Sequence, residues 1–183
     1  MKMKKGFIKA GAVLFMLATC GFRPLSAAPA LQANRAAPAF SAVSLEGRQA
    51  GSSTLVGKAY IINFFASWCP PCRGEIPDMV SLQNQYARKG FTFIGVAVSD
   101  SEPAIRDFVK KNSISYPVVM GTDAIVSAFN GYVEGGIRAI PTSFVINSSG
   151  KITNVITGAR SRADFEKLIL HALSKPGTTK SSL

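Results

Sequence analysis

Residues 59 to 73 read Ala-Tyr-Ile-Ile-Asn-Phe-Phe-Ala-Ser-Trp-Cys-Pro-Pro-Cys-Arg, an apolar run followed at once by a pair of cysteines. The run over residues 59–66 is almost unbroken, which is typical of a strand buried on both faces. Cys69 and Cys72 are separated by two residues, a spacing typical of redox pairs and of half a metal site. A helix that begins at the pair would stabilise a thiolate at its N-terminus. The context therefore favours a buried strand that ends in a redox pair at the start of a helix.

The segments on either side alternate between strand and helix patterns. The sequence predicts a helix over residues 70–89, with Pro77 as a kink and Gly90 as its C-cap. Ser101 and Ser161 are expected to cap two further helices. The other expected elements are strands at residues 91–98, 116–120, 142–147 and 151–157, a short helix at 123–129, and a hairpin of residues 40–44 and 48–50 around Glu46-Gly47. Such alternation predicts an α/β fold, a three-layer sandwich with an N-terminal hairpin.

The remaining cysteine and histidine argue against a structural zinc site. Such a site needs about four ligands, and outside the pair the chain has only Cys20 and His171. His171 falls in the expected last helix, and we interpret it as an ordinary helix residue. A disulfide that closes so short a loop adds little stability. We therefore expect the pair to serve chemistry, with no metal.

The N-terminal 30 residues have the pattern of an export signal. Four lysines precede the apolar stretch 10–22, and small residues with cleavage sites near Ala28 and Ala30 follow it. The stretch is shorter than the roughly 20 residues of a membrane span. Two alternatives are open: lipidation at Cys20 after Leu17-Ala18-Thr19, or an uncleaved anchor. Each of them predicts a periplasmic or otherwise extracytoplasmic protein, a compartment that permits disulfides.

Three regions are therefore expected: a signal segment at 1–30, one domain at 31–175, and a flexible tail at 176–183. Removing residues 1–30 takes away five basic residues, which leaves 16 basic and 10 acidic and lowers the formal net charge from +11 to +6. No basic stripe is interleaved with aromatic residues, so nucleic acid is not an expected partner.

Four short motifs resemble one family at specific spacings. They are Ala37-Pro38-Ala39-Phe40, the run from Ile62 to Arg73, Glu75-Ile76-Pro77, and Ile140-Pro141-Thr142-Ser143-Phe144. Over residues 38–173 the chain resembles the thioredoxin superfamily, and within it the ResA/TlpA-like thiol–disulfide oxidoreductases of the AhpC/TSA–redoxin group. The resemblance implies a thioredoxin-like fold with a central insertion, here residues 99–135.

The resemblance also implies roles for the residues around the cysteines. Cys69, nearer the helix start and more exposed, is the expected attacking thiol, and Cys72 is the expected resolving thiol. Glu75 lies one helical turn after Cys72. In ResA-like proteins a glutamate here influences cysteine titration, because a carboxylate near a thiol raises the pKa of the thiol. The alternative is that Glu75 is a solvated helix residue.

The predicted client-binding residues lie before the pair, between its two cysteines, and in the loop that is expected to face it. They are Trp68, Pro70, Pro71, Ile140 and Pro141. Trp68 is implied to pack beside the site, and the two prolines stiffen the turn, although a proline at a helix start is also common. The family implies a cis Ile140–Pro141 bond in a loop that faces the cysteines and offers backbone groups to the client.

Two positions depart from related sequences. Asn63 stands where many thioredoxins bury an aspartate, and an amide does not titrate, so Glu75 or water would have to move protons. Thr142 stands where the CcmG branch has a glutamate, which weakens assignment to that branch.

We expect an exported enzyme, a reductase of periplasmic protein disulfides that works as a monomer. Its only redox group is the Cys69–Cys72 disulfide, with no cofactor. A membrane dithiol transporter is the expected electron donor. The candidate clients are apocytochrome c during cytochrome c maturation, a copper-site protein, or periplasmic disulfides in general. The alternatives are a thiol peroxidase of the peroxiredoxin type and a metallochaperone for oxidase assembly.

Overall fold

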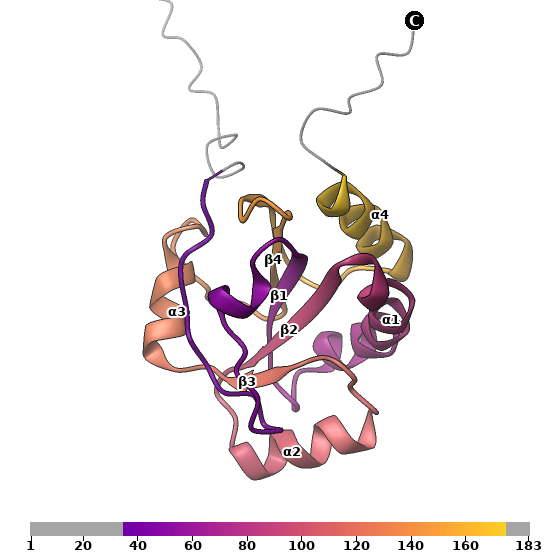
Figure 1. The fold of residues 1–183 in the computed structure, drawn as a ribbon. Helices are drawn as coiled ribbons and strands as arrows, with labels where there is room; N and C mark the ends of the chain where they lie inside the picture. Colours follow the sequence, from indigo (N-terminus) through magenta and orange to yellow (C-terminus); the bar gives the residue numbers. More distant parts are fainter. Residues whose placement is uncertain (1–34, 175–183) are drawn as a thin grey trace, which may run out of the picture.

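The computed structural model describes residues 35–174, in which five strands form one sheet in the order β3-β2-β1-β4-β5 (Figure 1). The strands are β1 (Ala59–Phe65), β2 (Phe91–Ala97), β3 (Val118–Met120), β4 (Thr142–Ile146) and β5 (Ile152–Thr157). The α-helices are α1 (Pro70–Tyr86), α2 (Glu102–Lys111), α3 (Asp123–Asn130) and α4 (Arg162–Leu173), and the 3-10 helices are η1 (Ser52–Leu55) and η2 (Ala87–Lys89). The predicted signal segment and C-terminal tail lie outside the described residues.

The central strand β1 explains why the sheet is mixed. All seven of its residues are buried, as its apolar sequence predicts. It pairs in parallel with β2, in the register Ala59↔Phe91, and antiparallel with β4, in the register Tyr60↔Ile146. The carboxyl end of β1 therefore lies beside the amino end of β4, and this juxtaposition brings the cysteines to the loop before β4.

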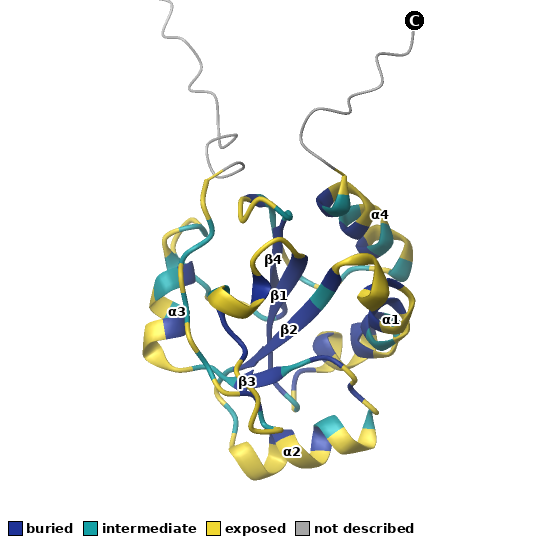
Figure 2. Ribbon diagram, viewed as in Figure 1, coloured by how far each residue is buried: buried dark blue, intermediate teal, exposed yellow. Residues whose placement is uncertain are grey.

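Helices cover the sheet on both faces, so the predicted three-layer sandwich is confirmed. One core cluster joins side chains of α1, α2 and α4 to one face of the sheet, and the other joins α3 and η1 to the opposite face. Figure 2 shows strands β1 to β4 almost entirely buried while the outer surfaces of the helices are exposed. Among residues 35–174, no helix is long and apolar enough to cross a membrane.

The helix caps follow the sequence pattern. The Oγ atoms of Ser101 and Ser161 accept hydrogen bonds from the backbone N–H groups of Ala104 and Asp164, at 3.4 and 3.2 Å. Gly90 ends the helical segment with φ +83°, a left-handed conformation that glycine adopts without a steric penalty. The helix expected at residues 70–89 is confirmed in extent, but its last turn is the 3-10 helix η2.

The N-terminal hairpin is smaller than expected, whereas the insertion contains the helix, the strand and the short helix that the sequence predicts. The hairpin forms a single antiparallel bridge, Val43↔Gln49, rather than two strands. Leu45 turns away to donate its N–H to the Val118 carbonyl at 2.8 Å, so this segment covers part of the outer edge of β3. Residues 99–135 contain α2, β3 and α3 and therefore form part of the sandwich itself.

Candidate active site

The Cys69–Cys72 disulfide lies at the carboxyl end of β1, where the strand turns into α1. Cys69 is the N-cap residue of α1, and its Sγ accepts a hydrogen bond from the Cys72 backbone N–H at 3.4 Å. Both cysteines are buried, Cys69 at 3% exposure and Cys72 at 0%. Cys69 is the more exposed of the two, in the order that the family resemblance implies. The helix N-terminus favours negative charge at the Cys69 sulfur once the disulfide is open.

The loop before β4 lies against the disulfide. The Ile140–Pro141 peptide bond is cis, as the resemblance implies. The Ile140 carbonyl oxygen lies 3.8 Å from the Sγ of Cys69. Thr142 is buried, and its hydroxyl donates a hydrogen bond of 2.7 Å to the Ala139 carbonyl, which fixes the chain on both sides of Pro141. The structure thus places Ile140 and Pro141 beside the cysteines.

Trp68 lies on the surface beside the cysteine pair, and a hydrogen bond to the loop after β2 fixes its side chain. Its side chain is 58% exposed, large for an aromatic residue, and its Nε1 donates a hydrogen bond of 2.9 Å to the Ser99 carbonyl. Asp100 accepts a hydrogen bond of 2.8 Å from the backbone N–H of Ser67. These two contacts join the loop after β2 to the loop that carries the cysteines. Nothing in the sequence pattern indicates that Ser99 and Asp100 stabilise the site.

Glu75 is buried, at 3% exposure, so the alternative of a solvated helix residue is wrong. Its Oε1 accepts a hydrogen bond of 2.8 Å from the Asn63 amide, and its Oε2 accepts one of 3.1 Å from the Arg160 backbone N–H. Burial raises the pKa of Glu75 to about 7, although both hydrogen bonds act to lower it. The group can therefore hold or release a proton near neutral pH.

The surroundings of Glu75 include residues that the sequence pattern does not reveal. The Asn63 amide also donates to the Ser143 hydroxyl at 3.0 Å, which links β1 to β4. Tyr116 is almost fully buried, and burial, then the negative charge of Glu75, raises the pKa of its phenol. Arg160 contributes through its backbone N–H and, more weakly, through its positive charge, and both act to lower the pKa of Glu75. Only the fold brings these four chain segments together.

A groove opens next to the disulfide. It has a volume of about 380 Å³ and lies between Trp68, the start of α3 and the loop before Pro141. Its lining is mostly apolar, with Arg138 and Asp123 as the charged members; the other side chains that shape it include Val126, Ile137 and Ile140. Pro70 and Pro71 are exposed at the first turn of α1, outside this groove. In residues 35–174 no three His, Cys, Asp or Glu side chains lie close enough together to hold a metal ion.

Comparison with known proteins places this arrangement among thiol–disulfide exchange proteins. The sequence profile of the Redoxin family matches residues 32–169. A relative from Bacillus subtilis, the thiol-disulfide oxidoreductase ResA, is 30% identical over 186 residues, which cover 97% of this chain and 98% of the relative. A second ResA, from Geobacillus kaustophilus, is 26% identical over 91% of this chain and 95% of its own length.

Solved structures agree with this match. A thiol:disulfide interchange protein of the thioredoxin family from Chlorobium tepidum is 52% identical, with a TM-score of 0.75, over 77% of this chain and 97% of that one. A second Chlorobium tepidum structure, a putative thiol:disulfide interchange protein DsbE, is 27% identical with a TM-score of 0.68, over 78% of this chain and 98% of that one.

Proposed function

The chain belongs to the Redoxin family and is a thiol–disulfide oxidoreductase of the ResA/DsbE type, and from this premise we propose that it reduces disulfides of exported proteins. The family assignment and the enzyme class inferred from the motifs are confirmed. The observation that carries the proposal is the position of Cys69, at the N-terminus of α1 and beside the Ile140 carbonyl, with Cys72 buried behind it.

The reaction starts from the dithiol form of the enzyme. The Cys69 thiolate attacks one sulfur of the client disulfide, and the other client sulfur leaves as a thiolate and takes up a proton. Cys72 then loses its proton and attacks the Cys69 sulfur of the mixed disulfide, which releases the second client thiol. Two electrons pass to the client, and the Cys69–Cys72 disulfide forms. Glu75, one helical turn from Cys72 and with a pKa near neutrality, accepts the proton that Cys72 gives up.

The client is held, in this proposal, by the surfaces that flank the disulfide. The backbone of Ile140 and Pro141 lies beside Cys69 and meets an extended segment of the client. Trp68 offers an exposed aromatic face, the kind of side chain that dominates binding at protein interfaces. The prolines at positions 70 and 71 remove two backbone N–H donors from the turn and stiffen it.

The direction of the reaction rests on the dipeptide between the cysteines. Oxidants of this superfamily usually carry a histidine there, which destabilises the disulfide, whereas Pro70 and Pro71 carry no such group. A reductant needs a regenerating dithiol, for which a membrane dithiol transporter is the proposed donor. The basic and apolar N-terminal segment supports export, which would place the monomeric enzyme outside the cytoplasm. The proposed client classes are apocytochrome c, a copper-site protein and general periplasmic disulfides.

A redox titration against glutathione tests the proposal. We expect a midpoint near the thioredoxin value of roughly −270 mV, and not near the roughly −120 mV of strong oxidants. The reduced enzyme should also reduce the interchain disulfides of insulin, and Cys69→Ala should abolish this activity. A midpoint at the oxidant end would reverse the proposed direction. Rapid reduction of hydrogen peroxide without insulin reduction would replace the proposal with a peroxidase.

A further inference from the structure

Exposed basic side chains collect at the end of the sheet that lies farthest from the disulfide. They are Arg35, Lys58, Arg88, Lys89 and Lys151, which we call the basic end. Backbone hydrogen bonds fix their proximity. The N–H of Ala59, directly after Lys58, donates to the Gly90 carbonyl, directly after Lys89, at 3.0 Å. The N–H of Ile152, directly after Lys151, donates to the Arg35 carbonyl at 2.9 Å.

The sheet separates the basic end from the redox site. Lys58 precedes the first residue of β1, and the cysteines follow its last. Because a strand rises about 3.3 Å per residue, the seven residues of β1 span about 20 Å. The antiparallel pair Tyr60↔Ile146 places the turn between β4 and β5, with Lys151, at the basic end too. Figure 1 shows this turn and the end of α4 at the top of the molecule, with α2 at the bottom.

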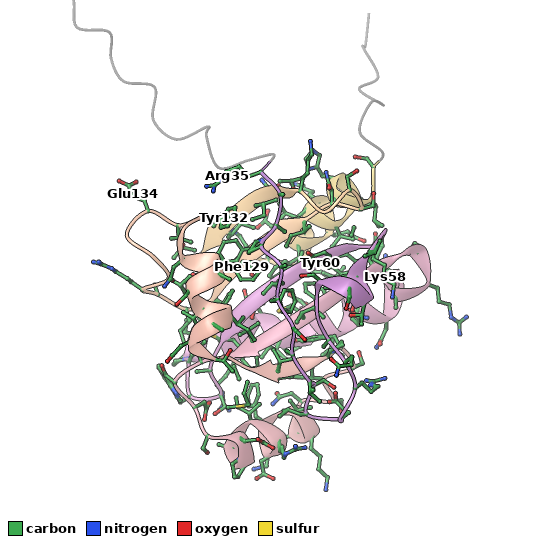
Figure 3. All side chains as sticks on the ribbon, turned by 60° about the vertical axis from the view of Figure 1, so that its left-hand side comes forward. Arg35, Lys58, Tyr60, Phe129, Tyr132 and Glu134 are labelled. Carbon is green, nitrogen blue, oxygen red and sulfur yellow. A yellow bond between two sulfur atoms is a disulfide. The ribbon has the colours of Figure 1, made fainter. Side chains whose placement is uncertain are left out.

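Ion pairs neutralise little of the charge on Arg88 and the lysines of the basic end. Within residues 35–174, Lys58, Arg88, Lys89 and Lys151 form no ion pair. Lys89 lies over the ring of Tyr86, at 4.5 Å from its centroid, and its positive charge also helps to lower the pKa of the nearby Glu166. Figure 3 shows Arg35 in the upper part of the molecule, with Glu134 pointing outward from the loop after α3, an acidic residue in the same region. The loops and helix starts around the disulfide, by contrast, mix both signs of charge: Arg73, Asp100, Asp123, Arg138 and Arg160.

The segments that join the described domain extend the same charge pattern in sequence. The first acidic residue of the chain is Glu46, and the N-terminal segment that leads to Arg35 carries basic residues and an apolar run of the export type. The nine residues after Ser174 include Lys175 and Lys180 and no acidic residue. Arg35, a member of the basic end, directly follows this N-terminal segment in the sequence.

We infer that the basic end docks on an anionic bilayer surface, with the Cys69–Cys72 disulfide directed away from the membrane. Clustered lysines and arginines bind anionic lipid headgroups through long-range attraction and need no shaped pocket. This surface is separate from the redox site. A client or electron donor would then meet Cys69 at about the length of β1 above the headgroups, so a donor needs a thiol-bearing part that projects from the membrane.

Vesicle flotation tests the docking surface. The full chain, as an expressing bacterium exports it, is mixed with vesicles of phosphatidylcholine alone or with equal phosphatidylglycerol, at low salt. Each lysine near an anionic surface strengthens binding about fivefold, so Lys58→Gln/Lys151→Gln should weaken binding to the anionic vesicles about 25-fold. Salt should weaken the wild-type interaction in the same way, because it screens the attraction.

A control pair removes two lysine charges from the opposite end of the domain, where Lys111 forms an exposed ion pair with Asp107 at 3.7 Å. Lys110 and Lys111 are exposed on α2, and Lys110→Gln/Lys111→Gln should weaken binding by no more than about twofold. Both variants should reduce insulin as the wild type does, so a failure of the docking inference is distinguishable from a failure of the proposed function. Equal weakening by the two pairs, or no preference for anionic vesicles, would overturn the inference. If the basic end binds an acidic protein and not a membrane, the protein should bind anionic and neutral vesicles equally, which would also overturn the inference.

The single tryptophan reports orientation even if the exported chain stays anchored. Trp68 lies beside the disulfide, so lipids brominated on their acyl chains should not quench its fluorescence. In a Trp68→Phe/Lys151→Trp variant, the new tryptophan at the basic end should be quenched in anionic vesicles. Quenching of Trp68 as strong as that at position 151 would show that the disulfide faces the membrane, and the inference would be wrong.

Discussion

The side-chain amide of Asn63 donates a hydrogen bond of 2.8 Å to the carboxyl group of Glu75, and both residues are buried. Asn63 lies in the middle of β1, whereas Glu75 lies on the second turn of α1, so the bond ties the central strand to the redox helix. The amide cannot titrate. The Asn63 amide can therefore only influence the pKa of the Glu75 carboxyl group.

Asn63→Ala should therefore raise the pKa of Glu75 above its value of about 7, because the variant loses a donor that favours the carboxylate. The buried acceptors left behind should also cost about 1–3 kcal/mol of stability. Carbon-detected NMR of the Glu75 carboxyl group in the oxidised protein measures the pKa. Ser143→Ala is the matched control, since Ser143 bonds to Asn63 and not to Glu75. An unchanged Glu75 titration in Asn63→Ala would contradict the prediction.

Stability should fall as pH rises between about 4.5 and about 7. Burial raises the folded-state pKa of Glu75 from 4.5 to about 7, so the folded protein holds a proton that the unfolded chain releases in this window. The stability linked to that proton is fully present below pH 4.5, and a shift of this size corresponds to a loss of about 3 kcal/mol by pH 8.

Urea unfolding of the oxidised protein at several pH values checks this dependence, since the disulfide keeps both cysteines from titrating. Glu75→Gln should remove most of the decline. A wild-type stability curve parallel to that of Glu75→Gln over pH 4.5 to 8 would show that Glu75 is not the responsible group.

Glu75→Gln should also lower the apparent pKa of the active-site thiols, because the ionised carboxylate opposes thiolate formation and the amide carries no charge. The rate of alkylation by iodoacetamide as a function of pH reports the titration in the reduced enzyme. Asp78→Asn, on the same helix one turn further along, should leave the curve unchanged. Curves that superimpose for Glu75→Gln and wild type would leave the buried carboxyl group without a role in the thiol chemistry.

Trp68→Ala should slow the reduction of protein disulfides more than it affects the fold. The side chain is 58% exposed, so its removal should cost no more than about 1 kcal/mol of stability. If Trp68 is a binding hot spot, kcat/KM for insulin should drop by about tenfold or more, mainly through KM. Reduction of a small aromatic disulfide provides the comparison, because it needs little of the protein interface. An equal loss on both substrates would assign Trp68 to the chemistry of the cysteines instead of to client binding.

Cys72→Ser should trap clients as mixed disulfides, because Cys69 can still attack while no resolving thiol remains. The covalent species should be separable on a non-reducing gel after expression of the variant in an exporting bacterium. Cys69→Ser should trap little, since Cys72 is fully buried beneath the first turn of α1. Stronger trapping by Cys69→Ser would reverse the assigned roles. The captured proteins would also distinguish cytochrome c maturation from assembly of a copper site.

Much of the fold follows from local patterns in the chain. The unbroken apolar run before the cysteines predicts β1, and the structure buries all seven of its residues. Serines before helices and Gly90 after one mark the helix ends through hydrogen bonds within a few residues. The hairpin near residue 46 is weaker than its pattern suggests, because Leu45 bonds to β3 in place of continuing the pairing.

In the site, too, some features follow from local sequence and others only from tertiary contacts. Cys69 and Cys72 are only three positions apart, so their spacing and the helix that starts at the pair were sufficient to identify a redox pair. The cis bond before Pro141 and its contact with Cys69 were expected only from the family resemblance. Their physical cause is the antiparallel register of β1 and β4, which brings residues about 70 positions apart into contact.

The charge state of Glu75 depends wholly on tertiary contacts. Its carboxyl group meets a strand side chain twelve residues before it and a backbone N–H 85 residues after it, and burial outweighs both bonds. Nothing local in Arg73-Gly74-Glu75-Ile76 distinguishes such a residue from an exposed helix glutamate, since the cost of burying charge comes from atoms far along the chain. The local order of residues is enough for the chemistry of the pair, whereas the proton balance beside it arises only when β1, α1 and the loop before α4 pack together.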